Sequence, residues 1–166
     1  MKINIAELMD GQKSQLSIEI KDEIEKLDSF GDEIILVEPI IFKGSIYISN
    51  EDFYIKGIVQ STGEFYCHRC LKKFEQNFCG EVDEKLVAED SLEAETGECY
   101  VIKSKQLDLS EIIQNTLIES LPMKIVCHED CKGLCLVCGK NLNEDTCECL
   151  KDEIDPRLAK LKDLLQ

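Results

Sequence analysis

Residues 127–149 have the sequence CHEDCKGLCLVCGKNLNEDTCEC and contain six of the chain's ten cysteines. Outside this stretch, the only close pair is Cys67-His-Arg-Cys70. Thiolates are soft, charged ligands that suit zinc, and two thiolates separated by two residues can turn toward one ion. Gly133 and Gly139 stand where tight turns would bring sulfur atoms together, because glycine adopts positive φ without a steric penalty. We therefore predict that a metal organises this segment.

Three other chemistries compete with zinc for these cysteines. Disulfides need an oxidising compartment, and the N-terminal sequence MKINIAEL lacks the apolar core of a signal peptide. A redox pair of thioredoxin type expects a βαβ context, which no part of the sequence predicts. The spacing Cys131-x-x-x-Cys135-x-x-Cys138 matches that of the iron–sulfur ligands in radical S-adenosylmethionine enzymes. Those enzymes need a barrel much longer than this chain allows, so zinc is the favoured interpretation.

The prediction is two tetrahedral zinc sites, each with four thiolates. An eight-residue loop readily closes two of the cysteine pairs onto one ion, and the remaining four cysteines would tie the C-terminal segment to the sheet. The predicted ligands are Cys135, Cys138, Cys147 and Cys149 in one site, and Cys67, Cys70, Cys127 and Cys131 in the other. Sites made only of thiolates are normally closed and structural.

Four other potential ligands are expected to lie outside these sites. His68 stands within a Cys-x-x-Cys pair, where a histidine more often points away from the metal. His128 is the only other histidine of the chain. Cys79 and Cys99 have no neighbouring cysteine and are expected to be buried or unused thiols.

Charge is the second informative property of the chain. Nineteen Lys and Arg against 34 Asp and Glu give a net charge of −15. Proteins that bind RNA or DNA mainly through phosphates need a basic surface, so this charge favours simple solubility or a basic protein partner. Residues 81–98 hold eight acidic side chains against Lys85 alone, and residues 91–97 are expected to form a mobile acidic loop.

Length and hydropathy point to a small cytosolic protein. A chain of 166 residues should form one domain, or one domain with a small appendage. No apolar stretch reaches the length of a membrane span. Together with the missing signal peptide, this predicts a cytoplasmic location.

Short apolar stretches separated by turn residues predict strands through much of the chain. Residues 16–20 alternate apolar and polar side chains, as a half-buried strand does. Further strands are predicted at 34–37, 40–48, 53–59, 64–67 and 74–87, with Pro39 and Gly63 among the residues that separate them. Such a series suggests an antiparallel meander that curls toward a barrel.

The clearest helix is predicted over residues 109–121. Asp108 can cap its first N–H groups, apolar side chains recur at helical spacing on one face, and Pro122 ends it. A short terminal helix is expected from Asp155-Pro156 onward.

The predicted fold class is α+β, with an antiparallel, partly barrel-like β-sheet packed by one main helix. A C-terminal zinc-binding segment and a short terminal helix complete it. Residues 1–124 would form the β-rich body, and residues 125–166 would pack on it as part of one domain.

Several of these motifs together resemble the YceD family, the large ribosomal RNA subunit accumulation proteins, in its cysteine-rich form. The resemblance covers the chain specifically from about Tyr66 to the C-terminus. It is carried by Cys67-His-Arg-Cys70-Leu-x-x-Phe74, Asp108-Leu109, Leu121-Pro122, Cys127, Cys131-Lys-Gly-Leu-Cys135-x-x-Cys138-Gly-x-Asn-Leu-Asn143, Cys147-x-Cys149 and Asp155-Pro-Arg-Leu158. It implies a role in accumulation of large-subunit ribosomal RNA, and a gene neighbourhood shared with a small, basic, zinc-binding protein of that subunit.

Two functions from different classes are therefore predicted. The leading one is a non-enzymatic ribosome-assembly factor that acts through contact with a basic ribosomal protein or a pre-ribosomal particle. No acid–base set or phosphate-binding loop suggests an enzyme, and no small-molecule substrate or membrane is expected. The alternative is a direct RNA-binding zinc module that uses Arg69, Lys72, Lys73, Lys132, Lys140, Arg157, Lys160 and Lys162.

Overall fold

The computed structural model describes residues 1–29, 32–49, 52–89 and 99–149. The chain divides into two compact units. The sheet unit comprises Met1–Phe65 and Phe74–Met123, and the cysteine unit comprises Tyr66–Lys73 and Lys124–Gln166. The cysteine unit therefore contains both the C-terminal segment and the turn that holds Cys67 and Cys70. Packing of the two parts as one domain stays a prediction.

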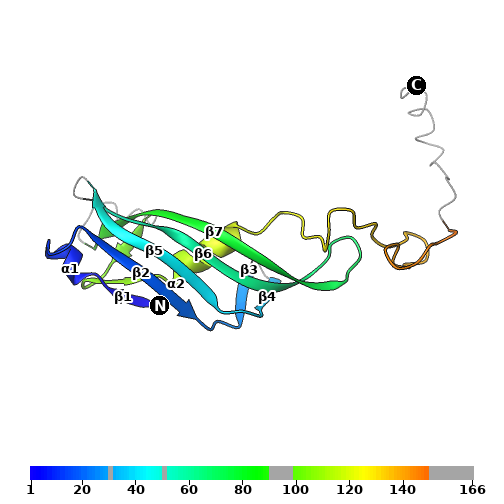
Figure 1. The fold of residues 1–166 in the computed structure, drawn as a ribbon, viewed down its shortest axis with the longest axis horizontal. Coiled ribbons are helices and arrows are strands. Elements are labelled where there is room, and N and C mark those ends of the chain that lie inside the picture. The colour runs from blue at the N-terminus through cyan, green and yellow to red at the C-terminus, as the bar shows by residue number, and fades with distance from the viewer. Residues whose placement is uncertain (30–31, 50–51, 90–98, 150–166) are drawn as a thin grey trace, which may run out of the picture. The chain divides into compact units, whose positions relative to one another are not determined.

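The sheet unit contains nearly all of the regular secondary structure (Figure 1). In chain order the elements are β1 (Lys2–Asn4), α1 (Ala6–Met9), β2 (Gln15–Asp22), β3 (Lys26–Ser29), β4 (Asp32–Leu36), β5 (Ile40–Ser49), β6 (Asp52–Tyr66), β7 (Lys73–Ala88), β8 (Tyr100–Ile102), β9 (Gln106–Asp108) and α2 (Ser110–Glu119).

The strands form one large sheet and one small one. The large sheet has the order β2-β5-β6-β4-β3, with β7 pairing β6 and β8, while β1 pairs β9 in a separate two-stranded sheet. Strands β5 and β6 make a long antiparallel ladder, from Ile41 opposite Gln60 to Ser49 opposite Asp52. The predicted antiparallel sheet is thus mostly confirmed, although β7 and β8 run parallel.

Two predictions about the strands are wrong in part. The sheet is not closed into a barrel, because the terminal strands β2 and β3 of its order do not pair with each other among the described residues. Residues 53–59 and 64–67 belong to the single strand β6, which continues through Gly63. Strand β3, which pairs antiparallel with β4, had not been predicted.

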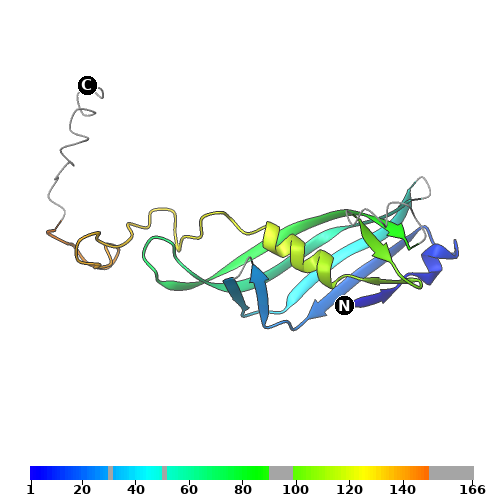
Figure 2. The same cartoon turned by 180° about the vertical axis from the view of Figure 1, so that it is seen from behind.

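Helix α2 lies along one face of the large sheet and closes the core (Figure 2). Ile112, Ile113 and Leu117 are fully buried, as is Leu109 just before the helix. A Cβ built on Gly80 of β7 would lie 2.6 Å from the Thr116 methyl carbon, so glycine permits this close approach. The predicted helix is confirmed with slightly shorter bounds.

Asp108 stands at the start of α2, as the sequence predicted. Its Oδ1 accepts a hydrogen bond from the Ser110 N–H at 3.0 Å, although Leu109 occupies the formal cap position. That hydrogen bond holds the pKa of the Asp108 carboxyl well below its usual range, at about 2.

The cysteine unit has little regular secondary structure among its described residues. Over residues 124–149 it contains turns and one isolated bridge, between Leu134 and Asn141. The expected terminal helix from Asp155 and the expected acidic loop at 91–97 lie outside the described residues. Neither helix in the described part of the chain is long and apolar enough to cross a membrane.

Candidate metal centres

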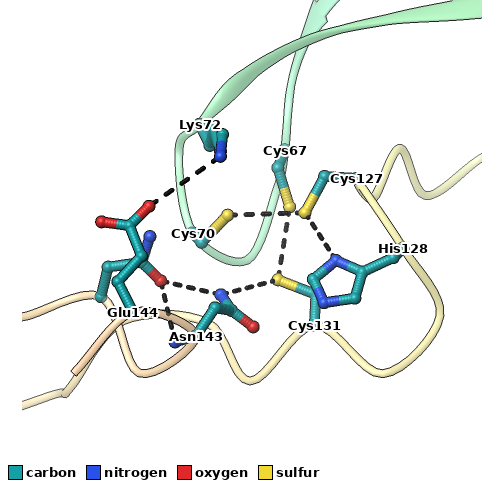
Figure 3. Close-up of polar contacts among 9 residues, drawn as sticks. Cys67, Cys70, Lys72, Cys127, His128, Cys131, Asn143 and Glu144 are labelled. Carbon is teal, nitrogen blue, oxygen red and sulfur yellow. Dashed lines mark hydrogen bonds and ion pairs between the residues drawn. The ribbon is translucent and has the colours of Figure 1, made fainter. Parts of the chain in front are cut away.

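The first group of cysteines combines a turn between two strands with the C-terminal segment. Cys67 and Cys70 lie between β6 and β7, and Cys127 and Cys131 follow α2 in the chain. Their sulfur atoms converge (Figure 3), with 3.8 Å between the Sγ atoms of Cys67 and Cys131 and 3.7 Å between those of Cys70 and Cys127. We call these four residues the first tetrad.

The second group lies entirely within the C-terminal segment. The Sγ atoms of Cys138 and Cys147 are 3.4 Å apart, as are those of Cys135 and Cys147. With Cys149 these residues form the second tetrad, and within each tetrad all sulfur atoms lie within 4.8 Å of one another. The structure thus brings the eight predicted ligands together in the two sets that the sequence suggested.

The sulfur separations fit a shared metal ion. A tetrahedral zinc with Zn–S bonds of about 2.3 Å places its sulfur ligands about 3.8 Å apart. The observed separations in the first tetrad match this value, and all ten cysteines are free thiols. Four thiolates are the donor set of structural zinc and of iron–sulfur centres. The arrangement therefore fits a closed metal site, and the identity of the metal belongs to the proposal below.

The two Cys-x-x-Cys pairs have the same backbone geometry. The first residues of segments 67–72 and 135–140 are Cys67 and Cys135. The carbonyl of each accepts a hydrogen bond from the N–H of the fifth residue of its segment, at 2.9 Å in both. The N–H of each cysteine donates to the carbonyl of the sixth residue, at 2.9 and 2.8 Å, and its sulfur accepts from the third N–H at 3.4 Å. The fifth residue has positive φ in both segments, +58° at Leu71 and +71° at Gly139. We call these two matching turns, 67–72 and 135–140, the knuckles.

Backbone donors prepare one sulfur atom in each tetrad for a cation. Burial raises the pKa of the Cys67 thiol, but N–H groups from Cys127, Cys70 and Arg69 outweigh burial and lower that pKa to about 5. At Cys135, N–H groups of Cys138 and Val137 lower the pKa to about 6. In each tetrad these N–H groups favour the thiolate form of one cysteine. Further thiols must lose protons when a metal binds, so metal affinity falls with falling pH.

Arg69 has a structural role that the sequence did not suggest. Its Nη1 donates to the carbonyl oxygens of Glu129 and Cys131 at 3.0 and 2.8 Å, and its own carbonyl accepts from the Leu134 N–H at 3.2 Å. A Cβ on Gly133 would lie 3.1 Å from that carbonyl oxygen. Arg69 therefore holds the backbone that carries Cys131.

The remaining candidates lie outside both tetrads. His68 Nδ1 accepts from the Ile125 N–H at 3.4 Å, whereas His128 Nδ1 lies 3.0 Å from the Cys127 sulfur (Figure 3). Cys79 is exposed on β7, so it is not the buried thiol that we considered, and Cys99 is half-buried. The contact made by His128 was not predictable, because adjacency to a ligand does not determine where a ring points.

Comparison with known proteins gives the family. The family model described as "Large ribosomal RNA subunit accumulation protein YceD" matches residues 55–165. The chain belongs to the YceD family. The matched region includes both tetrads. The family's name implies a role in the accumulation of large-subunit ribosomal RNA.

Similar proteins differ in how much of the chain they share. "Uncharacterized protein YlbN" of Bacillus subtilis (strain 168) is 23% identical over 100% of this chain and 97% of its own length. The chloroplastic "Large ribosomal RNA subunit accumulation protein YCED homolog 1" of Arabidopsis thaliana is 35% identical over 36% of this chain and 19% of its own length. Its namesake in Zea mays is 41% identical over 27% of this chain and 16% of its own length. No solved structure matches the chain significantly.

Proposed function

We propose that this protein is a non-enzymatic ribosome biogenesis factor that supports accumulation of large-subunit ribosomal RNA by contacting a basic ribosomal protein, alone or within a pre-ribosomal particle. The observation that carries the proposal is the uneven distribution of charge. The sheet unit has 9 Lys and Arg against 25 Asp and Glu, and the cysteine unit has the other 10 and 9 of the chain's 19 and 34. The acidity of the chain is thus a property of the sheet unit.

Physical chemistry favours a basic partner for such a surface. A net charge near −16 attracts cationic proteins and accelerates their association, whereas it repels the phosphates of RNA. At physiological salt, screening over about 8 Å weakens both effects without reversing them. The acidic residues at 89–98 are the proposed first contact.

Zinc is the proposed metal of both tetrads. Cys67, Cys70, Cys127 and Cys131 would hold one ion, and Cys135, Cys138, Cys147 and Cys149 the other. Zinc bound by four thiolates contributes folding free energy and leaves no open position for a reacting water. This supports a structural role for the metals and a protein without enzymatic activity.

The experiment measures binding of the full-length protein to an isolated basic large-subunit protein and to a ribosomal RNA fragment, at low and physiological salt. We expect affinity for the basic protein that falls as salt rises, and weak affinity for RNA. Replacing the five acids Glu89, Asp90, Glu93, Glu95 and Glu98 by amides should slow association. The matched control replaces the five acids Glu129, Asp130, Glu144, Asp145 and Glu148, and it should retain the wild-type rate. Equal rates in wild type and the first variant would contradict the proposed contact.

A direct RNA-binding zinc module is the second candidate, and the cysteine unit favours it because this unit is much less acidic than the sheet unit. Three of its proposed cations already have protein partners: Arg69 bonds two carbonyls, Lys72 pairs with Glu144 at 3.9 Å, and Lys140 with Asp145 at 3.7 Å. Tight RNA binding that is lost in a variant with Lys132 and Arg157 changed to Glu would favour this candidate. Arg69 stays unchanged in that variant because it holds the Cys131 backbone.

A further inference from the structure

One side chain connects the two tetrads. Asn143 lies in the loop between Cys138 and Cys147 of the second tetrad. Its Nδ2 nevertheless donates to the Sγ of Cys131 in the first tetrad, at 3.4 Å (Figure 3). The Asn143 Oδ1 accepts from the Lys132 N–H at 2.8 Å, next to the same ligand. A residue of one site thus supports a ligand of the other.

The position of Asn143 depends on the loop that the second tetrad closes. Asn141 Oδ1 accepts from both the N–H and the Nδ2 of Asn143, at 3.1 and 2.7 Å. The Asn141 carbonyl accepts from two further N–H groups, and the Leu142 N–H donates to Gly133 at 2.9 Å. The two ends of this loop are ligands of the second tetrad, so a metal there would restrict the loop and hold Asn143 against Cys131.

We propose that Asn143 couples the two metal sites, so that zinc in the second tetrad raises the affinity of the first tetrad for zinc. A hydrogen-bond donor offsets negative charge on a thiolate ligand, and partners of this kind typically change metal affinity by about tenfold to hundredfold. When the second site is empty, the loop is free to move. Forming the hydrogen bond from Asn143 to Cys131 then costs the conformational entropy of the loop, so the bond is weaker. Linkage requires that the first metal raise the affinity of the second site by the same factor.

The first experiment titrates zinc-loaded full-length protein with a chelator and follows the number of bound ions by native mass spectrometry. Asn143→Asp keeps an oxygen for the Lys132 N–H but replaces the donor to Cys131 by an anion. We expect the one-zinc species to accumulate more in this variant than in wild type. Glu144→Gln is the control. It removes only an exposed ion pair with Lys72, at 3.9 Å, and such pairs contribute little, so the species distribution should stay unchanged. Identical distributions in wild type and Asn143→Asp would overturn the coupling.

The second experiment isolates the first site. Cys138→Ser with Cys149→Ser removes two exposed ligands of the second tetrad. We expect this change and Asn143→Asp each to lower zinc affinity at the first site by about tenfold to hundredfold. In combination they should lower it no further than the larger single effect. Multiplied losses would overturn the coupling.

Cobalt replacing zinc gives a readout that loss of folding would not imitate. The sulfur-to-cobalt charge-transfer band of the first site should move to lower energy in Asn143→Asp, because a sulfur without its donor gives up an electron more easily. An unchanged band would contradict the proposal. The inference rests on the proposal that both tetrads bind metal, and the metal content of the wild-type protein separates the two. If the wild-type protein binds one ion, both the two-site proposal and the coupling are wrong. If it binds two ions that are released independently, only the coupling is wrong.

Discussion

The two compact units of this chain exclude water with different side chains. In the sheet unit, aliphatic and aromatic residues such as Phe42, Ile55 and Leu117 are fully buried. In the described part of the cysteine unit, every buried side chain belongs to a cysteine: Cys67, Cys70, Cys131 and Cys135. The sheet unit can therefore fold by burying apolar surface, whereas in the cysteine unit the proposed metals would offset the entropy of ordering the chain.

The same division separates charge. The sheet unit contains the excess of acidic residues and the cysteine unit is nearly balanced. The net charge of the whole chain therefore describes only one of its parts. An interaction driven by acidity is thus expected to use the sheet unit, and experiments that disturb one unit alone can test each role separately.

Metal removal should have the largest effect and should affect one unit. A structural zinc contributes on the order of 10–16 kcal/mol in small zinc peptides, which is comparable to the 5–15 kcal/mol stability of a whole domain. After chelation, we expect backbone N–H groups such as those of Leu134 and Cys135 to lose protection in hydrogen exchange, while those of β5 and β6 keep it. Added zinc should restore the protection. Simultaneous unfolding of both units would contradict the comparison.

A cavity in the apolar core should destabilise the sheet unit and leave the cysteine unit unchanged. Leu117 is fully buried, so Leu117→Ala should lower the free energy of unfolding of the sheet unit by about 2–5 kcal/mol. Urea titration followed by circular dichroism measures this change, and zinc content should stay at the wild-type value. Glu119→Gln on the same helix is the control and should change stability by no more than about 0.5 kcal/mol. Loss of zinc from Leu117→Ala would show that the two units depend on each other.

The secondary structure was predictable wherever alternation or helical spacing was strong, as in β5, β7 and α2. Gly63 suggested a break between strands, but β6 continues through it. A Cβ at this position would meet the Phe65 ring and Ile34, so side-chain packing, and not a turn, explains the glycine. The short strands β3, β8 and β9 have three or four residues, too few for a periodic pattern.

The cysteine groups were predictable because sequence spacing limits which sulfur atoms can meet. The supporting side chains were not predictable in the same way. Arg69 is separated from Cys131 by 62 positions, and Asn143 from its sulfur partner by 12. Nothing in the spacing of either residue specifies a contact with the opposite segment. Asn143 could have been suspected only as a turn-forming residue between two ligand pairs.

Substitutions at the equivalent positions 71 and 139 of the two knuckles should have opposite effects on metal binding. Gly139→Ala places a side chain in the left-handed region and should weaken metal binding at the second tetrad, by about 1–2 kcal/mol. Leu71→Gly removes such strain and should strengthen the first tetrad by a similar amount. Chelator competition measures both, with Val137→Ala, an exposed knuckle residue, as the neutral control. Effects of the same sign would show that the two knuckles are not equivalent.

The smallest expected effect concerns pH and the sheet unit. The folded pKa of Asp108 is about 2, below its ordinary value of about 3.9, so its carboxylate stabilises the fold. That contribution is complete above about pH 4 and is lost as the pH falls toward 2. Asp108→Asn should therefore be slightly less stable than wild type at neutral pH, by less than about 1 kcal/mol, since Asn also caps helices well. Urea titrations should show this difference shrinking as the pH falls, and a constant difference would contradict the assignment.

The central claim is that two four-thiolate zinc sites take the place of an apolar core in the cysteine unit. Metal analysis combined with X-ray absorption at the metal edge tests it most directly, in full-length protein purified without added metal. We expect two zinc ions per chain, surrounded by sulfur at about 2.3 Å with no nitrogen or oxygen ligand. One zinc per chain, or iron with visible absorbance, would contradict it.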